Sequence, residues 1–250
     1  MKLRLDDRVL LFGKDESYLV TVSRRKFNVK SGIINLGNLI GKSYGSKIKT
    51  HIGKEFCLVK PTVIDYFSKL FTRGAQVILP KDISLILAYT GISPDSFVVD
   101  AGTGSGYLTI FLAHYLSGGK VVTYEKDKRF VRVAKENIKS SGLKNIRLKK
   151  KDISKCIDER NVDMITLDLQ HPGKIIKNAY KSLAVGGWLV VYSPTVDEMF
   201  EAGKKMKKYF SDVKIVENIV REWQSERTLR PKTMGLMHTG WLMFGRKVSS

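Results

Sequence analysis

The chain has 250 residues, 43% of them hydrophobic, which predicts one sizeable domain with a smaller one. No apolar run is long enough to span a bilayer and the first residues are too polar for a signal peptide, so we expect a cytoplasmic protein without a membrane segment. Lys and Arg total 44 against 24 Asp and Glu, and this net charge of +20 favours a nucleic-acid partner over a small-molecule substrate.

Residues 1–60 predict a small β-rich domain. The runs Arg8–Phe12 and Tyr18–Val22 are rich in strand-forming residues and are joined by a polar turn with Gly13, which is typical of a hairpin. Further short segments separated by glycines indicate a small barrel or curled sheet. Basic clusters such as Arg24-Arg25-Lys26 favour an RNA-positioning role, and a subunit contact is the alternative interpretation.

Residues 61–92 predict a helical linker, and residues 93–250 predict the main domain. From Ser93 onward strands and helices alternate, which indicates an α/β fold with a doubly wound, Rossmann-like parallel sheet and helices on both faces. The expected strands are Phe97–Asp100, Val121–Glu125, Ile146–Lys149, Met164–Asp168, Trp188–Tyr192, Val213–Val220 and Thr239–Phe244. The expected helices are Thr62–Thr72, Ser105–Leu116, Arg129–Ser140, Ile175–Leu183 and Val196–Tyr209, with another helical run beginning at Ile83.

A glycine-rich loop between the first of these strands and its helix is the most informative motif. A short apolar run ends in Asp100, three glycines alternate after it, and a helical pattern follows. Glycine at these points lets the backbone turn tightly and approach a ligand, while the helix offers free N–H groups. The candidate cofactor-binding residues of the loop are Gly102, Thr103, Gly104, Ser105, Gly106, Tyr107 and Leu108.

The spacing of the glycines indicates which cofactor binds. A dinucleotide-binding loop reads G-x-G-x-x-G, but here Tyr107 holds the third glycine's place and the pattern is G-x-G-x-G. This pattern is typical of S-adenosylmethionine (SAM) methyltransferases and disfavours a dehydrogenase. Glu125 ends the next predicted strand, where its carboxylate can accept hydrogen bonds from both ribose hydroxyls.

Two aspartates follow later strands of the predicted sheet. Asp152 would lie beside the adenine of the cofactor, and its alternative role is a helix cap. Asp168 would lie beside the methyl donor, so it counts both as a cofactor-binding residue and as the catalytic candidate. Adenine N1 needs no base before methylation, so Asp168 would bind the N6 amino group and stabilise the positive charge that develops. A structural cap is again the alternative. No cluster with metal-ligand spacing is seen.

Together these motifs resemble the SAM-dependent tRNA (adenine-N1)-methyltransferases of archaea and bacteria. The resemblance spans nearly the whole chain and includes Pro80-Lys81-Asp82, residues 100–109, Leu167-Asp168-Leu169, Arg221-Glu222-Trp223 and His238-Thr239-Gly240. It implies methylation of adenosine 58 in the TΨC loop of tRNA, with position 57 as a second target in archaeal members, by a homotetramer. It also implies that the glycine loop, Glu125 and Asp152 bind SAM and that Asp168 is catalytic.

Two departures and two rival functions accompany this resemblance. Leu79 stands where the family has an aromatic residue, and Gly173 follows Pro172 where Trp is common, so the partner that stacks on the target base is not identified. The loop is also similar to that of protein L-isoaspartyl methyltransferases, which lack the basic leader. A tRNA-binding module without activity is the second rival. The basic segment that begins at Arg221 fits either RNA or a neighbouring subunit.

Overall fold

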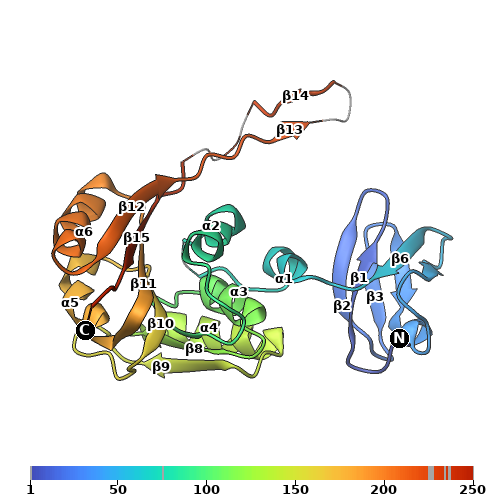
Figure 1. The fold of residues 1–250 in the computed structure, drawn as a ribbon. Helices are drawn as coiled ribbons and strands as arrows, with labels where there is room; N and C mark the ends of the chain where they lie inside the picture. Colours follow the sequence, from blue (N-terminus) through green and yellow to red (C-terminus); the bar gives the residue numbers. More distant parts are fainter. Residues whose placement is uncertain (1, 75, 225–227, 234, 236–237, 250) are drawn as a thin grey trace. The chain divides into compact units, whose positions relative to one another are not determined.

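The computed structural model describes every residue except 1, 75, 225–227, 234, 236, 237 and 250. The chain forms two compact units, Met1–Phe71 and Thr72–Ser250 (Figure 1). The boundaries expected from the sequence, at residues 60 and 92, stay a prediction about how the chain divides into domains.

The first unit is β-rich, as predicted. It contains β1 (Arg8–Phe12), β2 (Ser17–Thr21), β3 (Lys26–Val29), β4 (Gly32–Asn35), η1 (Leu36–Leu39), β5 (Lys47–Lys49), β6 (Glu55–Val59) and α1 (Val63–Lys69). Four strands make an antiparallel sheet in the order β2-β1-β6-β5, and β3 pairs with β4 as a separate hairpin. The hairpin packs against the sheet through one apolar core, in which Ile34 meets Val9, Leu11 and Leu58.

The second unit is built on a seven-stranded sheet. Its strands are β7 (Phe97–Ala101), β8 (Lys120–Glu125), β9 (Ile146–Lys150), β10 (Val162–Leu167), β11 (Leu183–Ser193), β12 (Ser211–Glu217) and β15 (Trp241–Arg246). Its helices are α2 (Pro80–Thr90), α3 (Tyr107–Tyr115), α4 (Lys128–Ser141), η2 (Pro172–Lys174), α5 (Ile176–Ser182) and α6 (Val196–Tyr209). The short strands β13 (Trp223–Gln224) and β14 (Arg230–Pro231) form a ribbon between β12 and β15.

The strand order explains where a site can form. The order is β12-β15-β11-β10-β7-β8-β9, in which the strands from β11 to β9 run parallel and β15 is antiparallel to both its neighbours. The chain leaves β7 toward β8 on one side, and it returns to β10 on the other. This reversal opens a crevice at the carboxyl ends of β7 and β10, where ligands bind in such sheets.

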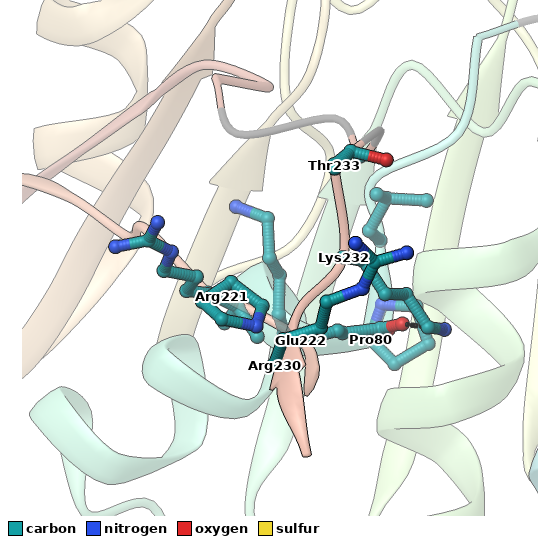
Figure 2. A pocket seen from close by; sticks show the side chains of 11 residues that line it. Pro80, Arg221, Glu222, Arg230, Lys232 and Thr233 are labelled. Carbon is teal, nitrogen blue, oxygen red and sulfur yellow. Dashed lines mark hydrogen bonds and ion pairs between the residues drawn. The ribbon is translucent and has the colours of Figure 1, made fainter. Parts of the chain in front are cut away.

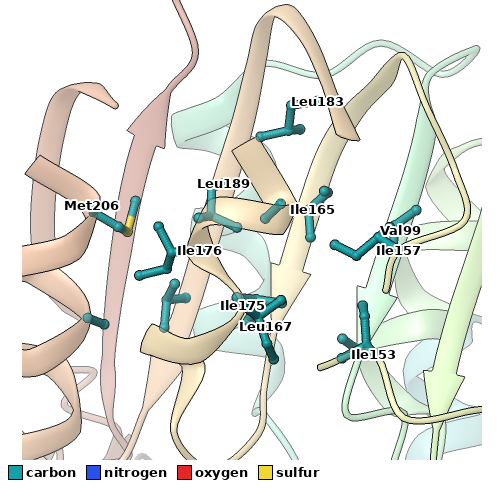
Figure 3. Packing of buried hydrophobic residues seen from close by; sticks show 14 of the residues in the cluster. Val99, Ile153, Ile157, Ile165, Leu167, Ile175, Ile176, Leu183, Leu189 and Met206 are labelled. Atoms are coloured by element: carbon teal, nitrogen blue, oxygen red, sulfur yellow. The ribbon is translucent and has the colours of Figure 1, made fainter. Parts of the chain in front are cut away.

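Both faces of the sheet are buried, because successive strand residues alternate between two apolar clusters. Val98, Val121 and Met164 face α2 and α3, whereas Val99, Val122 and Ile165 face α5 and α6. Figure 3 shows the second cluster, which includes Leu167, Ile176 and Met206. The predicted doubly wound α/β fold is therefore confirmed.

Several predicted boundaries are wrong, for local reasons. The helix expected at Ser105 begins at Tyr107, because Gly106 takes a left-handed backbone (φ +84°) that ends the loop. The helix expected at Ile175 is split into η2 and α5. Asp168 lies just beyond β10, since the last paired residue of that strand is Leu167. The last strand begins at Trp241 rather than Thr239, whose side chain makes other bonds described below.

Candidate active site

Gly102 brings the backbone of the glycine loop into contact with Asp168, the residue that follows β10. Its backbone is left-handed (φ +88°) and its N–H donates to the carbonyl of Tyr124 at 3.1 Å. A Cβ atom at this position would lie 1.7 Å from the backbone oxygen of Asp168. No side chain fits there, so the loop after β7 and the residue after β10 are in direct backbone contact.

The rest of the glycine loop is held by hydrogen bonds with α4 and with the segment that precedes α2. Asn137 on α4 donates to the carbonyl of Ser105 at 2.8 Å, and the Ser105 hydroxyl accepts from the N–H of Gly74 at 2.7 Å. Tyr107 and Leu108 are only 3% and 7% exposed, so they are positioned as supports of the loop in the core. Their direct contact with a cofactor, like that of the other loop residues, stays a prediction.

Glu125 lies at the end of β8, and its side chain holds the glycine loop through a hydrogen bond. Its Oε2 accepts from the N–H of Gly104 and its Oε1 from the N–H of Asp127, both at 2.9 Å. The residue is 8% exposed, and each carboxylate oxygen still has a lone pair available. The geometry therefore suits a carboxylate that accepts two further hydrogen bonds from a diol.

A cavity of about 290 Å³ lies against these strand ends. Three of the predicted cofactor residues line it, namely Gly102, Glu125 and Asp152. Leu169, Ile153 and Ile175 give it apolar walls, and Lys126, Lys151, Lys174 and His171 add polar groups. An apolar slot with a few directed polar groups is the usual form of a small-molecule site.

Asp152 lines the cavity, as the cofactor role requires, whereas the helix cap considered for it is wrong, because a turn and no helix follows it. In that turn its Oδ1 accepts from the N–H of Ser154 at 2.9 Å. The hydrogen bonds from Ser154 hold the pKa of Asp152 below its usual value, so the carboxylate is charged at neutral pH. A free lone pair can then accept from an exocyclic amine.

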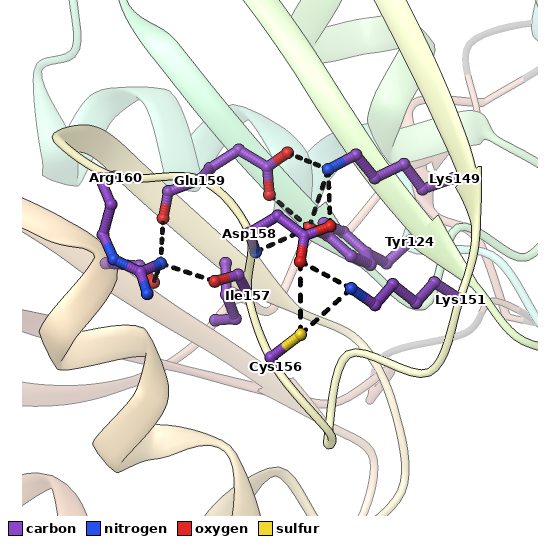
Figure 4. Close-up of polar contacts among 9 residues, drawn as sticks. Tyr124, Lys149, Lys151, Cys156, Ile157, Asp158, Glu159 and Arg160 are labelled. Atoms are coloured by element: carbon purple, nitrogen blue, oxygen red, sulfur yellow. Dashed lines mark hydrogen bonds and ion pairs between the residues drawn. The ribbon is translucent and has the colours of Figure 1, made fainter.

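A polar network shapes the neighbouring wall (Figure 4). The hydroxyl of Tyr124 accepts from the N–H of Asp158 at 3.1 Å and bonds to Glu159, while Lys149 lies over the Tyr124 ring. Lys151 forms an ion pair with Asp158 at 2.6 Å. These contacts fix the segment after β9, and with it the side of the cavity that Asp152 occupies.

Asp100 and Asp168 lie close together but differ in their surroundings. Asp100 is fully buried and accepts from three hydroxyls, those of Thr109 (2.5 Å), Thr123 (3.0 Å) and Thr166 (2.7 Å). Among the described residues, no group donates a hydrogen bond to the Asp168 carboxylate. Burial, followed by the charges of Asp100 and Glu125, raises the pKa of Asp168 to about 7. A carboxylate with a raised pKa at a crevice is typical of a functional group.

Tyr192 is a site residue that the sequence reasoning did not identify. The register pairs Val191 on β11 with Leu167 on β10, so the next residues along, Tyr192 and Asp168, are neighbours at the same edge. Burial and the charge of Asp168 raise the pKa of Tyr192 to about 12, so its hydroxyl remains a donor. It donates to the carbonyl of Thr239 at 2.5 Å. A tyrosine at the end of a predicted strand was the available signal.

A second, larger cavity of about 910 Å³ lies between α2 and the segment that carries β13 and β14. Leu79, Pro80 and Pro231 supply apolar surface, and Arg221 and Arg230 supply positive charge (Figure 2). Glu222, on the same wall, is paired with Lys232 at 2.5 Å. The cavity is therefore apolar and net positive, which suits a nucleotide better than a neutral metabolite.

Comparisons with known proteins agree on one family. The model of the family described as "tRNA methyltransferase complex GCD14 subunit" matches residues 56–240. Among curated relatives, a tRNA (adenine(57)-N(1)/adenine(58)-N(1))-methyltransferase TrmI of Methanocaldococcus jannaschii is 32% identical, over 96% of this chain and 94% of its own. A tRNA (adenine(58)-N(1))-methyltransferase TrmI of Thermus thermophilus is 27% identical over 88% of each chain.

Solved structures extend this similarity to three dimensions. The tRNA (m1A58) methyltransferase TrmI of Aquifex aeolicus superposes with a TM-score of 0.83 at 26% identity, covering 100% of both chains. A SAM-dependent O-methyltransferase of Thermotoga maritima superposes with a TM-score of 0.89 at 31% identity, covering 100% of this chain and 96% of its own.

Proposed function

The chain belongs to the GCD14 family of tRNA methyltransferase subunits, and from this membership we propose how its residues carry out the reaction. It is an enzyme that methylates N1 of adenosine in tRNA. We propose position 58 in the TΨC loop as the target. Position 57 is a second target to be tested, because the relative at 32% identity is named for both positions.

The site suits SAM as the methyl donor. Glu125 is placed to accept the ribose hydroxyls and Asp152 the adenine amino group, and the cavity that they line has apolar walls for the rings. The loop at Gly102 is in contact with the backbone of Asp168, and we propose that a ligand held by the loop lies near the Asp168 carboxylate. When bound there, SAM supplies an electrophilic methyl group on a positively charged sulfur.

Asp168 carries the proposal, because its carboxylate is the unsatisfied acceptor beside this loop. It accepts a hydrogen bond from the N6 amino group of the target adenine and orients N1 toward the methyl donor. Methylation at N1 leaves the ring positively charged, and the ionised carboxylate stabilises that charge in a partly desolvated site. No proton has to be removed from N1 beforehand.

One observation favours a second candidate, methylation of an oxygen atom. The similar Thermotoga maritima protein is described as an O-methyltransferase, and a carboxylate whose pKa lies at about 7 can accept a proton from a hydroxyl at neutral pH. The ribose 2′-hydroxyl would then be the group methylated. The two reactions give different nucleosides, so the product decides between them.

Binding of the tRNA is proposed to rest on the basic surface, including the Arg221 and Arg230 wall of the larger cavity. We also propose a homotetramer in the cytoplasm. The large apolar side chains on the segment between β12 and β15 support an assembly, since Trp223 is 56% and Leu229 73% exposed. No helix in the described part of the chain is long and apolar enough to cross a membrane.

The decisive test uses purified protein, unmodified tRNA transcript and SAM labelled in its methyl group. After digestion to nucleosides, we expect 1-methyladenosine, and a transcript with A58 replaced by G should lose the label at that position. A 2′-O-methyl product would favour the second candidate. Label on protein and none on tRNA would favour the isoaspartyl alternative, and SAM binding without any transfer would indicate an inactive module.

A further inference from the structure

A buried ion pair stands at the first turn of α2, outside the groups used above. Lys81 Nζ donates three hydrogen bonds, to Asp82 Oδ1 at 2.8 Å, to the carbonyl of Asn218 at 2.6 Å and to Thr239 Oγ1 at 2.7 Å. An ammonium group has three protons, so all of its donors are used. Asp82 is only 1% exposed, and its second oxygen accepts from Thr239 Oγ1 at 2.6 Å.

These bonds join segments that are far apart in sequence. Lys81 is separated from Asn218 by 137 positions and from Thr239 by 158. Asn218 follows β12 and Thr239 precedes β15, so the two residues are the two ends of the segment 218–239, which we call the arm. The Asn218 side chain returns a bond to the carbonyl of Lys81 at 2.6 Å. We call Lys81, Asp82 and Thr239 the clasp.

The clasp is also connected to the edge of the sheet at which Asp168 lies. Tyr192 donates to the carbonyl of Thr239, and Gly240 packs closely against the Tyr192 side chain, where a Cβ atom would come within 2.6 Å of the ring. Tyr192 is in turn the neighbour of Asp168 on the adjacent strand. The base of the arm is therefore packed against the residue beside the catalytic candidate.

The arm supplies half of the larger cavity. Leu79, Pro80 and Lys81 line it from α2, while Val220, Arg221, Arg230 and Pro231 line it from the arm. In the described part of the chain, the hydrogen bonds between α2 and the arm are those of the clasp and of Asn218. These bonds therefore join the two walls of the cavity at the base of the arm.

We propose that the clasp is a positioning device for the RNA: by fixing the base of the arm to α2, it sets the wall that receives tRNA next to Asp168. This inference rests on the proposed function. Thr239 acts through Lys81 and Asp82, and within the described part of the chain its hydrogen bonds reach none of the residues that line the cofactor cavity. Loss of the clasp therefore weakens the use of tRNA and leaves SAM binding unchanged.

Thr239 gives the cleanest test, because removing either charge would leave the other buried without its partner and would unfold a fraction of the protein. Thr239→Val removes the hydroxyl at nearly constant shape, and Thr239→Ser keeps the hydroxyl. We expect the Val variant to raise KM for tRNA about tenfold with SAM affinity within twofold of wild type, measured by steady-state kinetics and calorimetry. The Ser variant should behave as wild type.

Hydrogen exchange read by mass spectrometry tests the clasp without reference to activity. In Thr239→Val, amides at the base of the arm should exchange about tenfold faster, while those of the glycine loop keep their rate. The control is Asp212→Asn, which removes an exposed ion pair with Lys214 on β12 and should change neither readout.

The outcomes of these experiments test the clasp and the proposed function separately. Unchanged tRNA KM and unchanged exchange in Thr239→Val would overturn the clasp. Equal defects in the Val and Ser variants would overturn it too, because they would show that the shape of the side chain matters and that its hydroxyl alone does not hold the arm. Wild-type protein that makes no methylated tRNA would overturn the proposed function, and the exchange data would still decide whether the clasp holds the arm.

Discussion

The two sides of the candidate site are held by different kinds of contact. On the cofactor side, Gly104 donates its N–H to the carboxylate of Glu125, and Gly102 has to be glycine because a Cβ atom there would lie 1.7 Å from the carbonyl oxygen of Asp168. On the RNA side, α2 and the arm are held by side chains up to 158 positions apart. Close backbone contacts on the cofactor side require glycines at fixed spacing, and this leaves a motif in the sequence. On the RNA side, Pro80-Lys81-Asp82 and His238-Thr239-Gly240 are visible as separate segments, but the sequence does not show that they touch.

The largest effect should come from disturbing the cofactor side at its closest contact. Gly102→Ala places a Cβ atom against the Asp168 carbonyl and should cost at least about 4 kcal/mol of stability, with loss of SAM binding. Urea denaturation measures the first and calorimetry the second. Gly142→Ala is the matched control, since its backbone is also left-handed (φ +75°) but nothing lies within 4 Å, so about 1 kcal/mol is expected. Equal losses in both variants would contradict the backbone contact.

The second largest effect should come from changing Asp168, the catalytic candidate. Asp168→Asn keeps the shape of the side chain but removes the charge that stabilises a cationic base, so turnover should fall by about 10² to 10³. The affinities for SAM and tRNA should stay within a few fold. Single-turnover methylation measures the rate of the chemical step. Turnover close to wild type would remove Asp168 from the catalytic role.

The same substitution should change how stability depends on pH. A carboxyl pKa raised to about 7 means that the fold favours the neutral form, so wild-type protein loses stability as pH rises from about 4 through 7. Asp168→Asn cannot ionise, and relative to wild type it should gain about 1 to 3 kcal/mol at pH 8 and nothing at pH 4. Denaturation at both pH values checks this. An equal gain at both would show that the ionisation is not responsible.

The smallest expected effect is a difference in how salt changes the affinity for tRNA and the affinity for SAM. Release of counterions from phosphates predicts that tRNA affinity falls about tenfold or more between 50 and 200 mM salt. SAM affinity should change little, because its contacts are local and partly buried. Filter binding and calorimetry over the same salt series give the two slopes. Parallel slopes would mean that the basic surface does not serve the RNA side.

The sequence predicted those parts of the molecule that depend on local chemistry. The alternation of strands and helices along the chain predicted the sheet. The spaced glycines with Glu125 predicted a crevice at the strand ends, and its use by a cofactor stays a prediction. The start of α3 was missed because the left-handed conformation of Gly106 is a property of the folded loop. Tyr192 and the clasp were missed because their partners are set by strand order, which brings β11 beside β10 and β15 beside β11. No spacing rule within the chain encodes those contacts.

The arm enters and leaves the sheet at a single anchored point, between the paired strands β12 and β15. Residues can therefore be inserted or deleted beyond Asn218 and before Thr239 without changing the register of the sheet or the geometry of the glycine loop. Within such a layout, recognition of the macromolecule can diverge among relatives at little risk to methyl transfer itself. A designer who wishes to redirect the enzyme to another RNA would graft new arms onto an unchanged clasp.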